Sequence, residues 1–78
     1  MGWSYAIFDD ADGTCRVEVI DEDGVALPVA RQVTRAQAEG LVQRIGAEAG
    51  ETGKPVKAVI RDPYFMAATV ITIKRLQD

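Results

Sequence analysis

The chain has 78 residues, of which 47% are hydrophobic and 27% are charged, and its formal net charge is −3. This balance is typical of a globular protein and excludes an intrinsically disordered chain, and the length favours a single compact domain over residues 1–78. The absence of histidine and the presence of only one cysteine, Cys15, exclude most catalytic sites that work at neutral pH and most transition-metal sites.

The lone cysteine cannot form an internal disulfide, which suits a reducing compartment, and we expect a cytoplasmic protein. We expect no membrane association, because no apolar run approaches the roughly 20 residues that span a bilayer and no signal-peptide pattern is present. The charge is uneven: residues 1–30 hold seven acids and one base, whereas residues 31–78 hold eight bases and five acids.

The N-terminal part predicts a β-hairpin. Residues 3–8 and 14–20 alternate in side-chain character, and residues 9–13 between them are rich in turn formers. A shift of one residue would set Tyr5 against Arg16, so we expect the register that keeps the apolar side chains on one face. This register pairs Ile7 with Cys15, Tyr5 with Val17 and Trp3 with Val19.

Residues 25–33 predict a third strand, followed by an amphipathic helix. A turn that ends in a left-handed Gly24 would align Val19 with Leu27 and Val17 with Val29. Pro28 cannot donate a ladder hydrogen bond, so this strand should lie at a sheet edge. Thr34 and Gln37 have the spacing of a capping box, and helical apolar spacing continues until about Gly50.

The C-terminal part predicts two further strands. Residues 56–61 and 67–74 are rich in β-branched side chains, and residues 62–64 between them form a turn. The expected fold class is α+β in the order βββαββ, with a mostly antiparallel sheet and one helix packed on one face. The expected core consists of Trp3, Tyr5, Ile7, Val17, Val19, Leu27, Val29, Leu41, Val42, Ile45, Ile60, Ile71 and Ile73.

A sheet of this size would be only partly covered. One helix about 10 Å wide covers roughly two strands spaced about 4.8 Å apart, so part of the apolar face of the sheet would stay open. We expect a second copy of the chain or another partner to cover that face, or the sheet to curl around the helix.

Several familiar motifs fail on their spacing. The acidic turns before Gly13 and Gly24 place apolar residues at calcium-ligand positions of an EF-hand loop. A phosphate-binding loop that ends at Gly53 and Lys54 would need a glycine at Glu48 and a hydroxyl at Pro55. Cys15 lies on the predicted core face with no histidine to activate it. We therefore expect no enzymatic activity, no metal and no cofactor.

Two groups of residues are candidates for binding a protein partner. The acidic turns could mimic phosphates and occupy a basic, nucleic-acid-handling site, and an aromatic cluster after Pro63 could anchor a partner at a hairpin tip. The alternative without a binding role is that the acidic turns are ordinary solvated turns and that the aromatic side chains turn inward to close the core. The candidate residues are Asp9, Asp10, Asp12, Asp21, Glu22, Asp23, Tyr64, Phe65 and Met66.

The leading hypothesis is a non-enzymatic protein-binding module that acts as an acidic inhibitor. In size and charge the chain resembles the small inhibitors that phages and mobile elements encode, including anti-CRISPR proteins. The first alternative is a homo-oligomeric structural or assembly module. The second alternative is direct nucleic-acid binding through basic residues of the predicted C-terminal hairpin. The acidic net charge of the chain disfavours this alternative. Those basic residues are Lys57, Arg61, Lys74 and Arg75.

Overall fold

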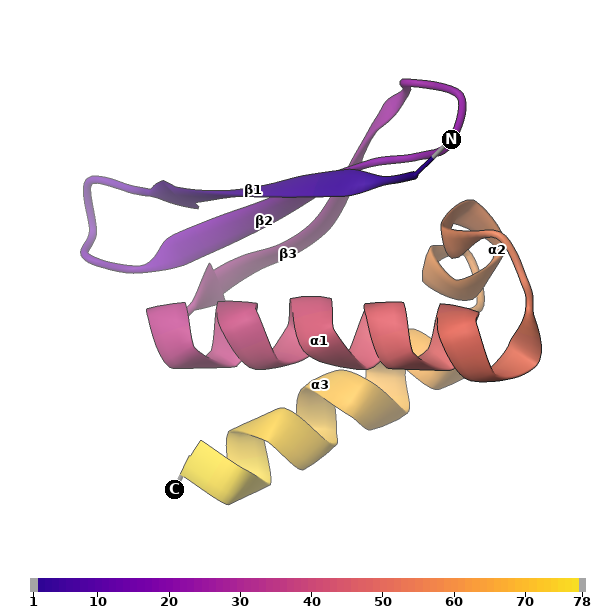
Figure 1. The fold of residues 1–78 in the computed structure, drawn as a ribbon. Helices are drawn as coiled ribbons and strands as arrows, with labels where there is room; N and C mark the ends of the chain where they lie inside the picture. The colour runs from indigo at the N-terminus through magenta and orange to yellow at the C-terminus, as the bar shows by residue number, and fades with distance from the viewer. Residues whose placement is uncertain (1, 78) are drawn as a thin grey trace.

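The computed structural model describes residues 2–77 and has three layers (Figure 1). The strands β1 (Ser4–Asp9), β2 (Cys15–Ile20) and β3 (Ala26–Val33) form one antiparallel sheet in the order β1-β2-β3. The helix α1 (Arg35–Thr52) packs against one face of this sheet, and α2 (Val56–Ile60) and α3 (Pro63–Gln77) pack against α1. The α+β class is therefore confirmed.

The predicted hairpin exists, but its register is shifted by two residues. Asp9 belongs to β1 and pairs with Cys15, so Ile7 lies opposite Val17 and Tyr5 opposite Val19. The turn is closed from Asp10, whose N–H donates to the carbonyl oxygen of Thr14 at 2.9 Å. Because side chains alternate along a strand, a shift of two residues leaves the same side chains on the core face.

The third strand lies at the predicted edge, and its register is correct only in its first half. Val19 pairs with Leu27 as expected, and Glu18 pairs with Pro28. A bulge then sets Val17 opposite Ala30, so the expected pairing of Val17 with Val29 is wrong. Bulges strengthen the local twist of a strand, and here they bend β3 toward the start of α1.

The helix α1 begins at the predicted capping box. The Oγ1 atom of Thr34 accepts from the Gln37 N–H at 3.1 Å, and the Gln37 side chain accepts from the Thr34 N–H at 2.9 Å. The helix continues past the expected end at Gly50 and is terminated by Gly53, which has a φ of 69° and donates to the Ala49 carbonyl. The left-handed backbone conformation that ends the helix at this position favours glycine.

The two predicted C-terminal strands are wrong, because both segments are helical. Asp62 and Pro63 form a helix start: Oδ1 of Asp62 accepts from the N–H groups of Tyr64 and Phe65, at 3.0 and 3.2 Å. A cap contributes about 0.5–2 kcal/mol, which is comparable with the strand preference of a β-branched residue, at most about 1 kcal/mol. Tertiary packing adds to this, since α2 buries Val56 and Val59 at helical spacing.

One buried cluster joins all the layers. Val17, Val19, Leu41, Val42, Ile45 and Ile73 are buried as predicted, and Trp3, Ile7, Leu27, Val29 and Ile60 are half-buried. Tyr5 and Ile71 were expected in the core but are 52% and 51% exposed. The cluster also includes Cys15, on the predicted core face, and residues outside the predicted core, namely Val33, Ala38, Val56 and Val59.

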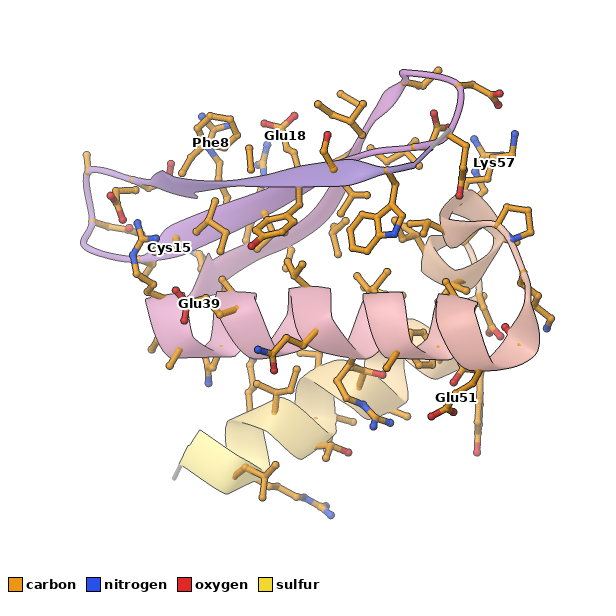
Figure 2. All side chains as sticks on the ribbon, in the orientation of Figure 1. Phe8, Cys15, Glu18, Glu39, Glu51 and Lys57 are labelled. Atoms are coloured by element: carbon orange, nitrogen blue, oxygen red, sulfur yellow. The ribbon has the colours of Figure 1, made fainter. Side chains whose placement is uncertain are left out.

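The prediction that part of the apolar face of the sheet stays uncovered by the helix is also wrong. With three strands in place of five, the sheet is narrow enough for α1 to lie along its apolar face (Figure 1). The opposite face carries Phe8 and Glu18, which point away from α1 (Figure 2). On that face the guanidinium of Arg16 lies 4.4 Å from the centre of the Phe8 ring.

Candidate functional site

The aromatic cluster after Pro63 lies in the first turn of α3, and the helix separates its members. Successive residues of a helix point about 100° apart, so neighbours in the sequence face different surroundings. Phe65 and Met66 are half-buried and pack against the core, whereas Tyr64 is 84% exposed. The expected hairpin tip does not exist, and only Tyr64 is presented as an exposed anchor.

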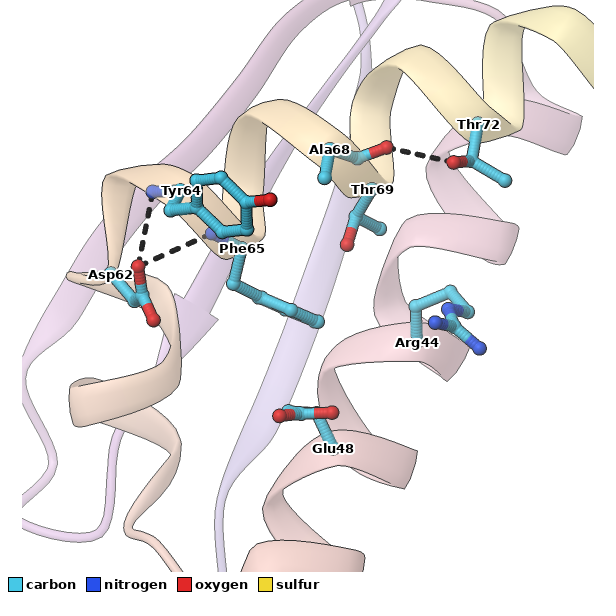
Figure 3. Close-up of a pocket in the computed structure, with 8 residues that line it drawn as sticks. All are labelled: Arg44, Glu48, Asp62, Tyr64, Phe65, Ala68, Thr69 and Thr72. Atoms are coloured by element: carbon cyan, nitrogen blue, oxygen red, sulfur yellow. Dashed lines mark hydrogen bonds between the residues drawn. The ribbon is translucent and has the colours of Figure 1, made fainter.

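An open groove of about 290 Å³ runs between α1 and α3 beside this tyrosine (Figure 3). The Phe65 ring points toward α1 inside the groove, and Arg44 and Glu48 of α1 line the opposite wall. Asp62 lies at the same end of the groove as Phe65. The groove therefore combines an aromatic surface with charged side chains of both signs.

The side of α3 that is not packed on α1 carries exposed apolar residues, two of which, Tyr64 and Ala68, also line the edge of the groove. Tyr64 and Ile71 lie two helical turns apart on this side, with the small side chains of Ala67 and Ala68 between them. All four are exposed, Ile71 to 51%. We call Tyr64, Ala67, Ala68 and Ile71 the α3 outer face.

The first acidic turn is bound largely to the rest of the chain. Asp9 pairs with Arg35 of α1 at 2.9 Å, and Asp10 pairs with Arg16 at 3.2 Å. Asp12 accepts hydrogen bonds from both the N–H and the hydroxyl of Thr14, at 3.0 and 2.6 Å. These contacts explain the sharp turn and offset two of its three charges.

The second acidic turn is held against α2 at the other end of the sheet (Figure 1). Asp21 is buried and accepts from the N–H groups of Asp23 and Val25, both at 2.9 Å. Oε1 of Glu22 accepts from the N–H of Val56, the first residue of α2, while its Oε2 atom is buried without a hydrogen-bond partner among the described residues. Asp23 pairs with Lys57.

These contacts move the pKa values of the turn residues. The hydrogen bond from Lys57 and the charge of its ammonium lower the pKa of Asp23, and the same pair raises the pKa of Lys57. The pKa of Asp9 is lowered by the Cys15 thiol and Arg35, and that of Asp12 by the Thr14 hydroxyl. All three carboxylates therefore favour the charged form.

The four basic candidates do not share one surface. Lys57 and Arg61 belong to α2 and its C-cap, whereas Lys74 and Arg75 lie in the last turns of α3. The eleven helical steps from Tyr64 to Arg75 alone correspond to roughly 16 Å along a helix. The predicted basic hairpin is wrong, and Lys57 is already paired with Asp23.

Cys15 offers little nucleophilic chemistry in this setting. Its side chain is buried, as predicted, and its thiol donates to Oδ1 of Asp9 at 3.4 Å. Burial and the neighbouring carboxylate raise the pKa of the thiol, which disfavours the reactive thiolate. Among the described residues no three acidic or cysteine side chains gather closely enough to hold a metal ion.

Comparison with known proteins identifies no relative. No family model, curated protein sequence or solved structure matches this chain at a significant level. In residues 2–77, none of the helices combines the length and the apolar character that crossing a membrane requires.

Two features of the site were missed in the sequence but left a signal there. The Asp62-Pro63 pair is a helix N-cap followed by the preferred first-turn residue, and it was interpreted as a turn. Helical spacing of Tyr64 and Ile71 would then have revealed the α3 outer face. The contact of Glu22 with Val56 left none, because it joins residues 34 positions apart.

Proposed function

We propose that this chain is a non-enzymatic protein-binding module and that it binds through the α3 outer face. The observation that carries the proposal is the 84% exposure of Tyr64 beside Ile71, on a helix whose opposite side is already packed on α1. Tyrosine is enriched at the energetic centres of interfaces, because it adds a large apolar surface and a polar hydroxyl with little loss of entropy.

The chemistry of the remaining residues supports a binding role over catalysis. The chain has no imidazole, and its one thiol is buried with a raised pKa. Most of its turn carboxylates are engaged in hydrogen bonds or ion pairs within the chain. General acid-base or nucleophilic chemistry would need such groups free and directed into a pocket.

Site-specific photo-crosslinking in cells of the native host tests the proposal. A photoreactive phenylalanine analogue replaces Tyr64 in one variant and Phe8, on the uncovered sheet face, in a matched control. We expect the variant with the analogue at position 64 to form a covalent adduct with a partner protein, which mass spectrometry identifies, and the variant with the analogue at position 8 to form none. No adduct at position 64, with the variant folded and expressed, would reject the α3 outer face as a binding surface.

The acidic inhibitor remains a second, more specific proposal. It is favoured by the β1–β2 turn, which extends beyond the start of α1 (Figure 1) and carries Asp12, with Asp10 at the base of the turn. A basic nucleic-acid-handling protein is the partner that such a tip would fit. In the second turn, by contrast, Glu22 and Asp23 already contact α2.

Charge neutralisation separates the two proposals. Asp10→Asn and Asp12→Asn together should weaken binding of a basic partner and flatten its salt dependence, whereas Tyr64→Ala should leave that binding unchanged. The α3 proposal predicts the opposite result for the protein that cross-links to position 64. Tyr64→Ala should weaken its binding, and the two aspartate changes should leave it unchanged, as measured by titration with the purified partner. Equal affinity for all three forms of the chain would exclude both surfaces.

A further inference from the structure

We infer that the partner of the α3 outer face is a second copy of this chain, bound with its α3 antiparallel to the first. The inference rests on the proposed protein-binding role of this face. It adds the identity of the partner and the register of the contact.

The spacing of the α3 outer face is self-complementary. Its residues follow the order large, small, small, large at positions 64, 67, 68 and 71, which all lie on one side of the helix. A two-fold axis between Ala67 and Ala68 sets Tyr64 of each copy against Ile71 of the other. The two contacts are identical, as a two-fold interface requires.

The small residues at the centre allow the helices to approach closely. Helices pack with their axes about 8–10 Å apart, and the distance depends on the side chains at the crossing point. Ala67 and Ala68 are both exposed and leave room for the opposite backbone. Tyr64 and Ile71 would then cover the centre from both ends and remove their own exposed apolar surface from water.

The charges at the two ends of α3 match the antiparallel arrangement. Asp62 and Glu48 lie at the N-terminal end of α3, and Arg75 lies in its last turn, seven residues and so two helical turns after Ala68, which lines the groove. In the antiparallel register Arg75 of each copy reaches the groove end of the other, where these two carboxylates are. Three bases offset part of this attraction: Arg61, next to Asp62 in the chain, Arg44, which lines the same groove, and Lys54, which lies beside Glu48 and Asp62.

None of these three groups forms an ion pair with another of the described residues, 2–77. The ion pairs found among residues 2–77 involve Arg16, Arg35 and Lys57 with acids of the two turns. Within this part of the chain Glu48 and Arg75 therefore have no competing ion pair, and Asp62, whose Oδ1 atom caps α3, keeps its Oδ2 atom for a contact across the interface. A parallel arrangement would instead place Arg75 of one copy beside Arg75 of the other, and these like charges would repel each other.

Charge pairs at the two-fold axis give the sharpest test. A charge at position 68 meets the same charge in the second copy, so Ala68→Glu and Ala68→Lys should each weaken dimerisation at least tenfold in sedimentation equilibrium. An equimolar mixture of the two variants should restore a dimer. Ala47→Glu and Ala47→Lys place the same charges on an exposed alanine of α1 and should dimerise like the unchanged chain.

A cross-linking variant keeps the test decisive if a charged variant fails to fold. Ala68→Cys should form a disulfide-linked dimer under mild oxidation, because close helices bring the two Cα atoms within the roughly 4.4–6.8 Å that a disulfide spans. Cys15 is buried and stays out of this reaction. Ala47→Cys should remain monomeric under the same conditions.

The outcomes separate this inference from the proposed function. A monomeric chain throughout the concentration series, or Ala68→Glu dimers as stable as the unchanged ones, would overturn the antiparallel dimer. If position 64 nevertheless cross-links to a different protein in cells, the binding role of the α3 outer face stands without the dimer. If it cross-links to nothing, both fail.

Discussion

Gly46 of α1 lies against the indole of Trp3, so that a Cβ on this glycine would stand only 3.1 Å from Cζ2 of Trp3. A glycine inside a helix is unfavourable by about 1 kcal/mol relative to alanine. The contact explains why α1 tolerates one here: the missing side chain lets the N-terminal aromatic residue reach the helix. The same helix has two further glycines, Gly40 and Gly50, with different surroundings.

We predict that the three glycine-to-alanine variants differ in sign or size. Gly40→Ala should raise the free energy of unfolding by about 1 kcal/mol, because its new methyl meets Ile73 at an ordinary distance of 3.7 Å. Gly50→Ala, with open space around it, should gain about as much from helix propensity alone. Gly46→Ala should gain less than either or lose stability. Urea unfolding measures all three, and equal gains would contradict the Trp3 contact.

The link between Glu22 and α2 should contribute measurably to stability. Glu22→Ala removes the acceptor of the Val56 N–H, and we expect the free energy of unfolding to fall by about 1–2 kcal/mol. Glu22→Gln keeps the acceptor for the Val56 N–H and removes the negative charge beside the unpartnered Oε2 position, so it should lose less than the alanine variant. If urea unfolding ranks the two variants in the opposite order, the contact does not stabilise α2.

The helical geometry of the C-terminal segment can be tested with two isoleucines. A strand would bury both Ile71 and Ile73 on one face, whereas the helix buries Ile73 to 8% exposure and leaves Ile71 at 51%. We expect Ile73→Ala to lower the free energy of unfolding by about 2–4 kcal/mol and Ile71→Ala by less than about 1 kcal/mol. The comparison is made in dilute solution, below the onset of self-association, and similar losses would favour a strand.

Stability should fall at both extremes of pH through the pair of Asp23 and Lys57. The pKa of Asp23 in the folded chain lies below its ordinary 3.8, so its contribution is present above about pH 4 and is lost as pH falls through the folded pKa. The pKa of Lys57 lies above its ordinary 10.5, so its contribution is present below that value and is lost as pH rises through the folded pKa.

Variants that each remove one charged group show which groups cause the pH dependence of stability. In urea unfolding over a pH series, Asp23→Asn should make the acid limb shallower, and Lys57→Met should do the same to the alkaline limb. Asp12→Asn should also reduce the acid dependence, because the Thr14 hydroxyl lowers the pKa of Asp12. An unchanged acid limb in both aspartate variants would show that these carboxylates are not responsible for it.

Local patterns in the sequence predicted the first half of the fold well. The alternation around Val17 and Val19, the edge position of Pro28 and the capping box at Thr34 each depend on neighbours close in the chain, and the structure confirms them. The predicted hairpin register was wrong by two residues because nothing local showed that Asp9 extends the strand.

The C-terminal half was wrong because two influences compete there. Ile71 and Ile73 favour a strand by intrinsic preference, but the Asp62 cap and the packing against Gly40 of α1 favour a helix. For the candidate site, the aromatic cluster was found in the sequence, while the exposure of Tyr64 follows only from the helix. The internal partners of the acidic turns depend on residues far away in the chain, such as Arg35 and Lys57.

The position of α1 between two layers affects how the chain matures on the ribosome. The sheet and α1 are complete in the nascent chain before α3 emerges, because α3 follows both of them in the chain. Until then the side of α1 around Gly40, which Ile73 covers in the finished protein, stays in contact with water. Chains that end just before Pro63 and have fully left the ribosome should therefore bind holdase chaperones, whereas chains that include all of α3 should not.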